Sequence, residues 1–149
     1  MPQERSGVAD VRLLAAVSGG GVLGALARYG LQTACPHRAA QFGWATLAIN
    51  VSGCLLIGII AVLIAGAPGT HRLVRPFLVT GVLGGYTTFS TYVVDIQHAL
   101  LAGAPRTALL YGAVTLVGSL AAAWAGMEVG GAVVGRWAKA ELPGTEEAS

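Results

Sequence analysis

Four long apolar stretches, separated by three short polar connectors, organise the chain. A membrane-spanning helix needs about 20 mostly apolar residues, and each stretch is long enough. The stretches run from about residue 11 to 31, 42 to 65, 74 to 102 and 107 to 134. The connectors hold Pro with charged or turn-forming residues, as loops do: Cys35-Pro36-His37-Arg38, Ala67-Pro68-Gly69-Thr70 and Gly103-Ala104-Pro105-Arg106.

This pattern predicts an all-α integral membrane protein with four transmembrane helices in one domain. The domain would span residues 11–134, between an N-terminal segment (1–10) and a polar C-terminal tail (135–149). The stretch from Lys139 to Ser149 is polar and acidic, so we expect it to be disordered.

The third stretch is expected to break in the middle of the membrane. Its centre reads Gly84-Gly85-Tyr86-Thr87-Thr88-Phe89-Ser90-Thr91-Tyr92, and paired Gly followed by Thr and Ser forms helix poorly. Non-helical backbone at membrane depth persists only where protein or a lined cavity satisfies it. Carbonyl groups freed there would suit a cation. The alternative is a continuous but weakened helix.

Small residues indicate how the helices pack. The chain has 22 glycines, and small residues let helix backbones approach closely in a bilayer. Two predicted packing faces are Ala16, Gly20 and Gly24 in the first stretch, and Gly118, Ala122, Gly126 and Gly130 in the fourth. Four thin helices enclose little space, so we expect an oligomer.

Composition supports a membrane protein and excludes other classes. Apolar residues make up 54% of the chain and charged residues 11%, against about 25% charged in soluble domains. The net charge of +2 comes without a basic cluster, which argues against a nucleic-acid partner. Gly19, Gly21 and Gly24 fit a G-x-G-x-x-G pattern, but no strand context supports a dinucleotide site. No catalytic set or metal-ligand spacing is present, so no enzyme is predicted.

Lys and Arg are distributed unevenly between the two sides of the predicted bundle. The side of the termini would hold Arg5, Arg12, Arg72, Arg75, Arg136 and Lys139, and the other side Arg38, Arg106 and Arg28. The excess of positive charge predicts that both termini are cytoplasmic.

Polar residues inside apolar spans are expensive and mark functional positions. Asn50 lies in the second stretch, one turn after Thr46, and an Asn amide donates two hydrogen bonds. Its alternative role is to hold helices together. Tyr111, Thr115 and Ser119 are four residues apart and place three hydroxyls on one helix face. Their alternative role is hydrogen bonding to their own helix.

Aromatic rings next to the expected break suggest the kind of ion. Phe89 and Tyr92 lie on adjacent turns, and ring edges carry partial positive charge. Together with amide and hydroxyl donors they would suit a small hard anion. Only Asp95 and Glu128 are acidic in the last two stretches. Arg28, at the end of the first stretch, would attract anions or lie at the interface.

Three segments resemble the fluoride-channel family called CrcB or Fluc. They are Gly-Ala-Leu-Ala-Arg-Tyr (24–29), Trp-Ala-Thr-Leu-Ala-Ile-Asn-Val-Ser-Gly (44–53) and Gly-Val-Leu-Gly-Gly-Tyr-Thr-Thr-Phe-Ser-Thr-Tyr (81–92). The resemblance covers residues 12–134. It implies an antiparallel, dual-topology dimer in the cell membrane that exports cytoplasmic fluoride passively through two pores. It also implies a structural sodium ion, not transported, at the dimer centre.

By position, the resemblance assigns roles to residues of this chain. The sodium ligands would be the carbonyls of Gly84 and Thr87. The fluoride pathway would contain Asn50, Phe89, Tyr92, Tyr111, Thr115 and Ser119, with Tyr92 replacing the second Phe of the family pattern. Supporting positions would be Arg28, Thr46, Thr88 and Asp95.

Two other assemblies and functions compete with this interpretation. The charge bias suggests insertion in one orientation, with pairing to an oppositely oriented paralogue instead of a homodimer. The chain would then be a non-conducting or assembly subunit of a heterodimeric fluoride channel. A proton-coupled exporter of cationic drugs would need a carboxylate in the first stretch, and none lies there.

Overall fold

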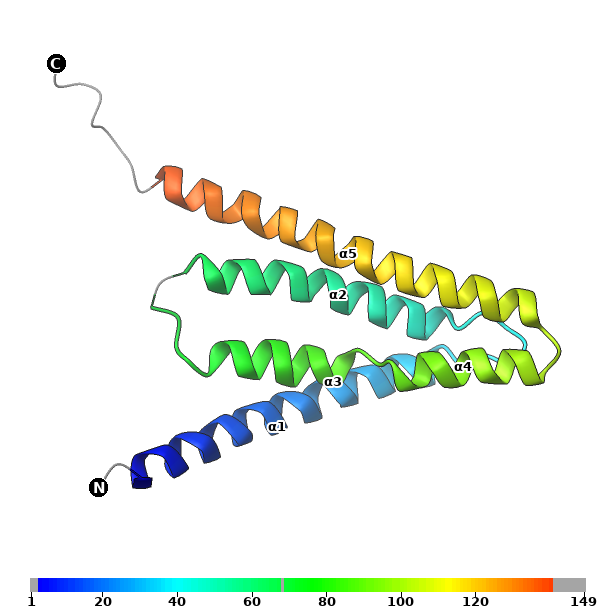
Figure 1. The fold of residues 1–149 in the computed structure, drawn as a ribbon, viewed down its shortest axis with the longest axis horizontal. Coiled ribbons are helices and arrows are strands. Elements are labelled where there is room, and N and C mark those ends of the chain that lie inside the picture. The colour runs from blue at the N-terminus through cyan, green and yellow to red at the C-terminus, as the bar shows by residue number, and fades with distance from the viewer. Residues whose placement is uncertain (1–2, 68, 141–149) are drawn as a thin grey trace, which may run out of the picture.

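The computed structural model describes residues 3–67 and 69–140, with side chains from residue 10 to 67 and 69 to 139. All regular structure in this part is helical (Figure 1). The elements are α1 (Gln3–Ala34), α2 (Trp44–Ala65), a π-helix η1 (Pro76–Leu83), α3 (Gly84–Tyr86), α4 (Ser90–Leu101) and α5 (Pro105–Ala140).

Four helical segments are long and apolar enough to cross a membrane, which confirms the four-helix prediction. They are Asp10–Ala34, Trp44–Ala65, Pro76–Leu101 and Pro105–Lys139. Helix α1 begins at Gln3 and α5 continues to Ala140, so helix extends into both expected terminal segments. The rest of the expected disordered tail, residues 141–149, lies outside the described residues.

The helices pack as two close pairs (Figure 1): α1 lies along η1 and α3, and α2 lies along α5. Glycines at both crossings allow backbone contact, as the sequence predicted. A Cβ on Gly24 would overlap the carbonyl oxygen of Val82, and one on Gly126 would overlap that of Leu55. The shorter helix α4 packs against α5.

The third span is interrupted. Helix α3 ends at Tyr86, and Thr87 is extended, with φ −72° and ψ 157°. Helix α4 then starts with a side-chain cap, because the Thr91 amide donates to the Thr88 hydroxyl at 3.1 Å. Such caps satisfy an amide that has no partner inside the helix. The hydroxyls and glycines that made this segment a poor helix thus shape the interruption.

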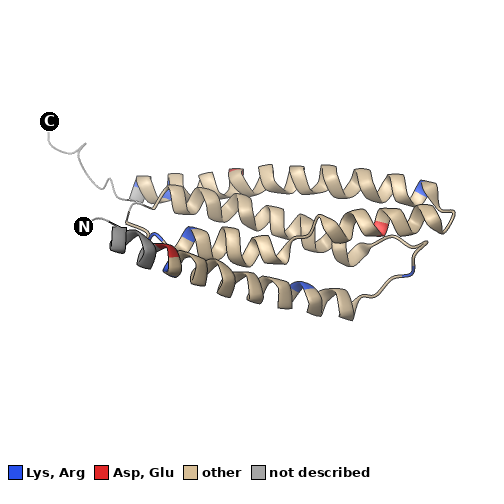
Figure 2. Cartoon of the chain, turned by 60° about the horizontal axis from the view of Figure 1, so that its bottom comes forward, with Lys and Arg blue, Asp and Glu red and all other residues tan. Residues whose placement is uncertain are grey.

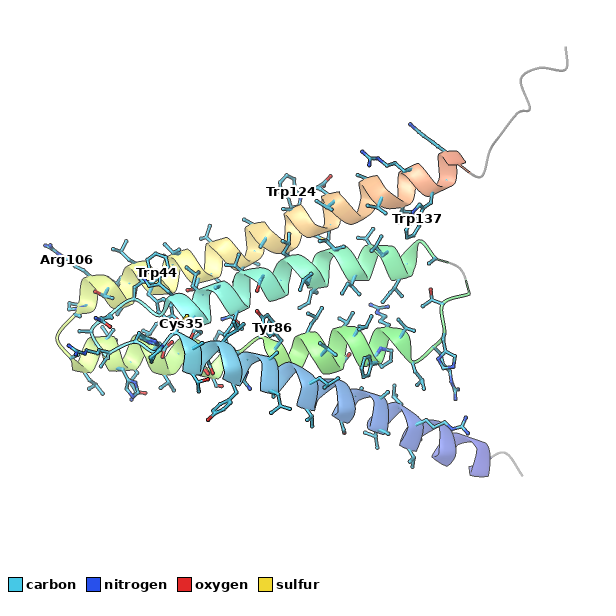
Figure 3. All side chains as sticks on the ribbon, turned by 180° about the vertical axis from the view of Figure 1, so that it is seen from behind. Cys35, Trp44, Tyr86, Arg106, Trp124 and Trp137 are labelled. Carbon is cyan, nitrogen blue, oxygen red and sulfur yellow. The ribbon has the colours of Figure 1, made fainter. Side chains whose placement is uncertain are left out.

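Most of the outer surface is apolar, and the polar groups gather at its ends. Trp124, in the middle of α5, points outwards and is 63% exposed (Figure 3). Trp44 and Trp137 lie towards opposite ends (Figure 3), where interfacial aromatic residues are enriched in membrane proteins. Figure 2 shows Lys and Arg concentrated at the end that holds both termini. The chain is a multi-pass membrane protein.

Candidate functional site

A cavity of about 210 Å³ lies beside the interruption of the third span. Helices α2 and α5 form one side, and the interrupted segment with the start of α4 forms the other. Its lining combines an amide, hydroxyls and aromatic rings: Asn50, Cys54, Thr87, Thr88, Phe89, Tyr92, Thr115, Leu116 and Ser119. Six predicted pathway or supporting residues, together with Thr87, are therefore brought together.

Asn50 replaces the hydrogen bonds that the interrupted helix lacks. Its Nδ2 donates to the Thr88 carbonyl at 2.9 Å, and its Oδ1 accepts from the Thr88 amide at 2.9 Å. Both residues are 8% exposed. This pairing supports the alternative role of holding helices together, yet it uses only one of the two N–H groups of the amide. The other N–H has no partner among the described residues, and Asn50 is one of the residues that line the cavity.

Thr115 and Ser119 bring hydroxyls without a partner. Within the described residues, neither hydroxyl oxygen has a hydrogen-bond partner, and both are buried. The alternative that these hydroxyls bond to their own helix is therefore wrong. Buried polar groups nearly always have a hydrogen-bond partner, so two buried hydroxyls without a partner in one cavity require an explanation. A ligand or water in the cavity would supply one.

Two aromatic rings form the rim of the cavity. The ring centroids of Phe89 and Tyr92 are 5.7 Å apart, with the planes at 50°. The Tyr92 hydroxyl donates to the Gly112 carbonyl of α5 at 2.8 Å. The extra hydroxyl of Tyr92, relative to the expected Phe, is thus satisfied by the protein. Phe89 is 76% exposed and faces away from the chain's own core.

The interruption also frees two carbonyl groups. In a continuous helix the Gly84 carbonyl would accept from the Thr88 amide, and the Thr87 carbonyl from the Thr91 amide. Instead, Thr88 donates to Asn50 and Thr91 donates to the Thr88 hydroxyl. Among the described residues, no backbone amide replaces these donors. Gly84 and Thr87 are the positions expected to bind a cation.

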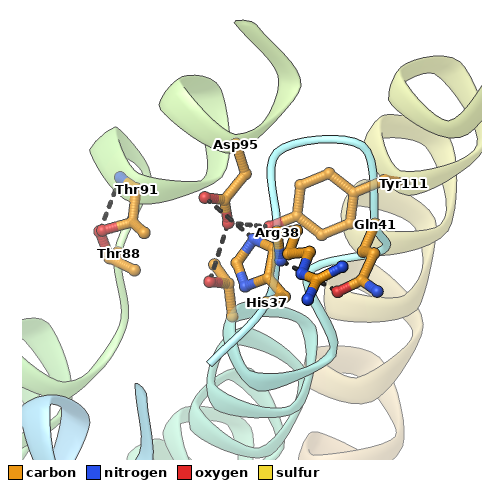
Figure 4. Close-up of polar contacts among 8 residues, drawn as sticks. His37, Arg38, Gln41, Thr88, Thr91, Asp95 and Tyr111 are labelled. Carbon is orange, nitrogen blue, oxygen red and sulfur yellow. Dashed lines mark hydrogen bonds and ion pairs between the residues drawn. The ribbon is translucent and has the colours of Figure 1, made fainter. Parts of the chain in front are cut away.

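Besides Gly84, four predicted residues lie outside the cavity lining. Arg28 donates through Nε to the Gly85 carbonyl at 3.2 Å and so connects α1 to the end of α3. Thr46 and Tyr111 both donate to Oδ2 of Asp95, each at 3.0 Å (Figure 4). Tyr111 stays connected to the cavity through Tyr92, whose ring centroid is 5.6 Å away.

Sequence reasoning did not identify the partner of Asp95 in the first connector. Nε2 of His37 lies 3.4 Å from Oδ1 of Asp95 (Figure 4). The two residues are far apart in sequence, and His37 showed no metal-ligand spacing. A second missed pair joins the Ser52 and Tyr86 hydroxyls at 3.0 Å, between α2 and α3.

The family profile and the similar proteins that match this chain point to the same family. The sequence profile of the family described as "CrcB-like protein, Camphor Resistance (CrcB)" matches residues 15–127. A relative from Streptomyces avermitilis, named "Fluoride-specific ion channel FluC 2", is 52% identical over 70% of this chain and 66% of the relative. Relatives of the same name from Thermobifida fusca and Nocardia farcinica are 49% and 46% identical, over 74% and 87% of this chain and 82% and 89% of their own lengths.

Proposed function

The chain belongs to the CrcB family, whose members are ion channels and not enzymes, and from this we propose that it is a fluoride-specific channel through which cytoplasmic fluoride leaves the cell passively. The cavity beside the helix interruption carries the proposal, because an amide and two unpartnered hydroxyls line it. The names of the relatives supply the identity of the ion.

The chemistry of the cavity suits a strongly hydrated anion. Fluoride must exchange its water shell for hydrogen-bond donors, and the free N–H of Asn50 with the Thr115 and Ser119 hydroxyls supplies three. No Asp or Glu is among the described residues that line the cavity, so nothing there repels an anion at short range. We expect the complete pore to exclude larger halides by its width.

The aromatic rim would extend this path. Phe89 and Tyr92 can present their positive ring edges to an anion. The Tyr92 hydroxyl is occupied by Gly112, so its ring is held in place and its edge remains available. We therefore expect Tyr92 to serve in place of the family's second Phe.

A structural sodium ion fits the freed carbonyls of Gly84 and Thr87. Sodium prefers oxygen ligands, and unwound backbone in membrane helices supplies them. Both carbonyls have lost their helical donors. When bound, the ion would hold the two half-helices in register and add positive potential near the path. Further ligands would come from the same carbonyls of a second subunit.

The assembly that fits these features is an antiparallel dimer in the cell membrane, with the interruption at mid-membrane. Phe89 is 76% exposed beside a cavity that the single chain does not close. A second subunit would cover both, and lipid would contact the remaining apolar surface. The second subunit is either another copy or an oppositely oriented paralogue. In the latter case this chain acts as one subunit of a heterodimeric channel.

Fluoride efflux from liposomes that contain only this purified chain tests the function. A fluoride electrode should record rapid fluoride efflux after a potassium ionophore is added. In the control, vesicles loaded with chloride and followed with a chloride electrode should show no efflux. Absence of efflux from folded protein, followed by efflux once a paralogue is co-reconstituted, would favour the heterodimer. Absence of efflux in both preparations would contradict the proposal.

Removing the two unpartnered hydroxyls should impair conduction without harming the fold. In the double variant Thr115→Val, Ser119→Ala we expect efflux to fall by about a hundredfold or more, since each hydrogen bond to an ion contributes roughly 1.5–3 kcal/mol. Thermal stability should be equal or higher, because neither hydroxyl loses a protein partner. Thr33→Val is the matched control, as the exposed Thr33 hydroxyl bonds to its own helix at Tyr29. Normal efflux in the double variant would remove these hydroxyls from the path.

The orientation of the chain can be measured at its own Cys35. This thiol is exposed just after the end of α1, away from the end of the molecule at which Lys and Arg are concentrated (Figure 2). If the charge excess orients the chain, a membrane-impermeant maleimide should label nearly all Cys35 in intact cells. Equal dual topology would give about half of the labelling seen after lysis. The variant Cys35→Ser measures the background labelling that comes from Cys54.

A further inference from the structure

The first connector folds over the end of the bundle and places His37 against Asp95. Four segments meet at this carboxylate. Its Oδ2 accepts from Thr46 of α2 and Tyr111 of α5, each at 3.0 Å, and its Oδ1 lies 3.4 Å from His37 Nε2 (Figure 4). The Asp95 side chain is 11% exposed and that of His37 is 25% exposed. His37 is thus the outermost member of a mostly buried polar cluster.

His37 is the one partner of Asp95 that can carry positive charge in this contact. Among the side chains that the structure describes, this pair is the only ion pair. The other titratable or charged groups near this end include Cys35 and Arg38 around the connector, Tyr92 and His98 on α4, and Arg106 and Tyr111 on α5. Arg28, on α1, donates instead to the Gly85 carbonyl. A protonated His37 would neutralise Asp95, whereas a neutral His37 would leave the carboxylate without a counter-charge.

Asp95 lies at the end of the hydroxyl column of α5. Tyr111 starts this column, one turn before Thr115, and donates its hydroxyl hydrogen bond to Asp95. Its ring also contacts Tyr92 at the rim of the cavity, with centroids 5.6 Å apart. A carboxylate without a counter-charge at this position would repel an anion that enters or leaves the cavity. A neutralised carboxylate would not.

We propose that His37 is a positioning residue whose protonated imidazole neutralises Asp95 and holds it against Thr46 and Tyr111, so that fluoride passes faster when His37 is charged. This inference rests on the proposed function. Histidine is the side chain that changes charge in the neutral range, and the charged form is the one present at lower pH. Fluoride conductance therefore rises as the pH falls from about 8 to about 5.5.

The test is a pH profile of fluoride efflux from liposomes that contain the full-length chain, with equal pH on both sides. Protein-free vesicles at each pH correct for undissociated HF that crosses the lipid. We expect efflux from the unaltered protein to rise about threefold over the range, the size that a partly exposed ion pair supports. Efflux through the His37→Gln variant should be slow and should not depend on pH. His37→Arg, which stays charged, should be fast and independent of pH.

Two further variants separate a charge effect from a structural one. His98→Gln, on the exposed face of α4, should keep the profile of the unaltered protein. Asp95→Asn should conduct fluoride rapidly and at the same rate at every pH. Adding His37→Gln to this variant should change neither the rate nor the pH profile, because the charge that His37 neutralises is gone. A purely structural His37 would instead lower efflux equally at every pH.

The outcomes distinguish the two proposals. If the unaltered chain conducts fluoride and His37→Gln keeps its pH profile, the role of His37 is wrong and the channel function stands. If the unaltered chain conducts no fluoride at any pH, alone or with a paralogue, the proposed function fails and the inference fails with it.

Discussion

Replacing Asn50 by alanine is expected to abolish fluoride efflux from reconstituted vesicles and to destabilise the protein. The substitution removes the free N–H from the cavity. It also removes the two hydrogen bonds that join Asn50 to the Thr88 backbone, both 2.9 Å long. The Thr88 amide and carbonyl would then be unpaired at a position that is 8% exposed. Each such loss costs roughly 1–3 kcal/mol.

Controls separate lost conduction from lost structure. Ser52 lies two residues further along the same helix, and its hydroxyl bonds to Tyr86 outside the cavity lining. The control Ser52→Ala removes this hydroxyl. It should conduct normally. Asn50→Asp keeps an acceptor for the Thr88 amide but replaces the donor with a negative oxygen. It should fail to conduct, and it should be no more stable than Asn50→Ala, because a buried carboxylate oxygen would face the Thr88 carbonyl without a partner. Normal efflux from folded Asn50→Ala would contradict a role for this residue in the path.

Fold class and family were predictable because the bilayer imposes simple rules on the sequence. Apolar stretches of the required length and Pro-containing connectors predicted the four spanning helices, which the structure confirms. The resemblance of residues 81–92 to the CrcB family is confirmed by the family match. Paired Gly followed by Thr and Ser in residues 84–92 indicated a poor helix where the third span is interrupted. These signals are local, so they can be recognised in a single sequence.

The contacts within the site were less predictable because they join distant segments. Asn50 was identified as a candidate, but its pairing with Thr88 spans 38 residues and depends on how α2 meets the interruption. The contact of His37 with Asp95 requires the connector to fold back, and no spacing rule encodes that. The Tyr92 hydroxyl needed a partner, and only the structure identifies the Gly112 carbonyl.

Introducing one methyl group at Gly24 is expected to be among the most damaging changes to the fold. A Cβ there would overlap the Val82 carbonyl oxygen and lie 2.7 Å from the Tyr86 amide nitrogen. Both are backbone atoms, so rotation of a side chain cannot relieve the contact. Overpacking of this kind costs roughly 1–3 kcal/mol or more. Gly24→Ala should therefore lower the thermal midpoint in detergent, although alanine favours helix by about 1 kcal/mol over glycine.

Gly19→Ala is the matched control, because a Cβ at Gly19 meets no atom of this chain within 4 Å. It should unfold at the same temperature as the unaltered protein or higher, as measured by circular dichroism during heating. The two variants differ only in whether the methyl faces η1. Displacement of α1 by Gly24→Ala would also move the end of α3, where Arg28 bonds to Gly85. Conduction should therefore fall together with stability, and equal stability of the two variants would contradict the close crossing.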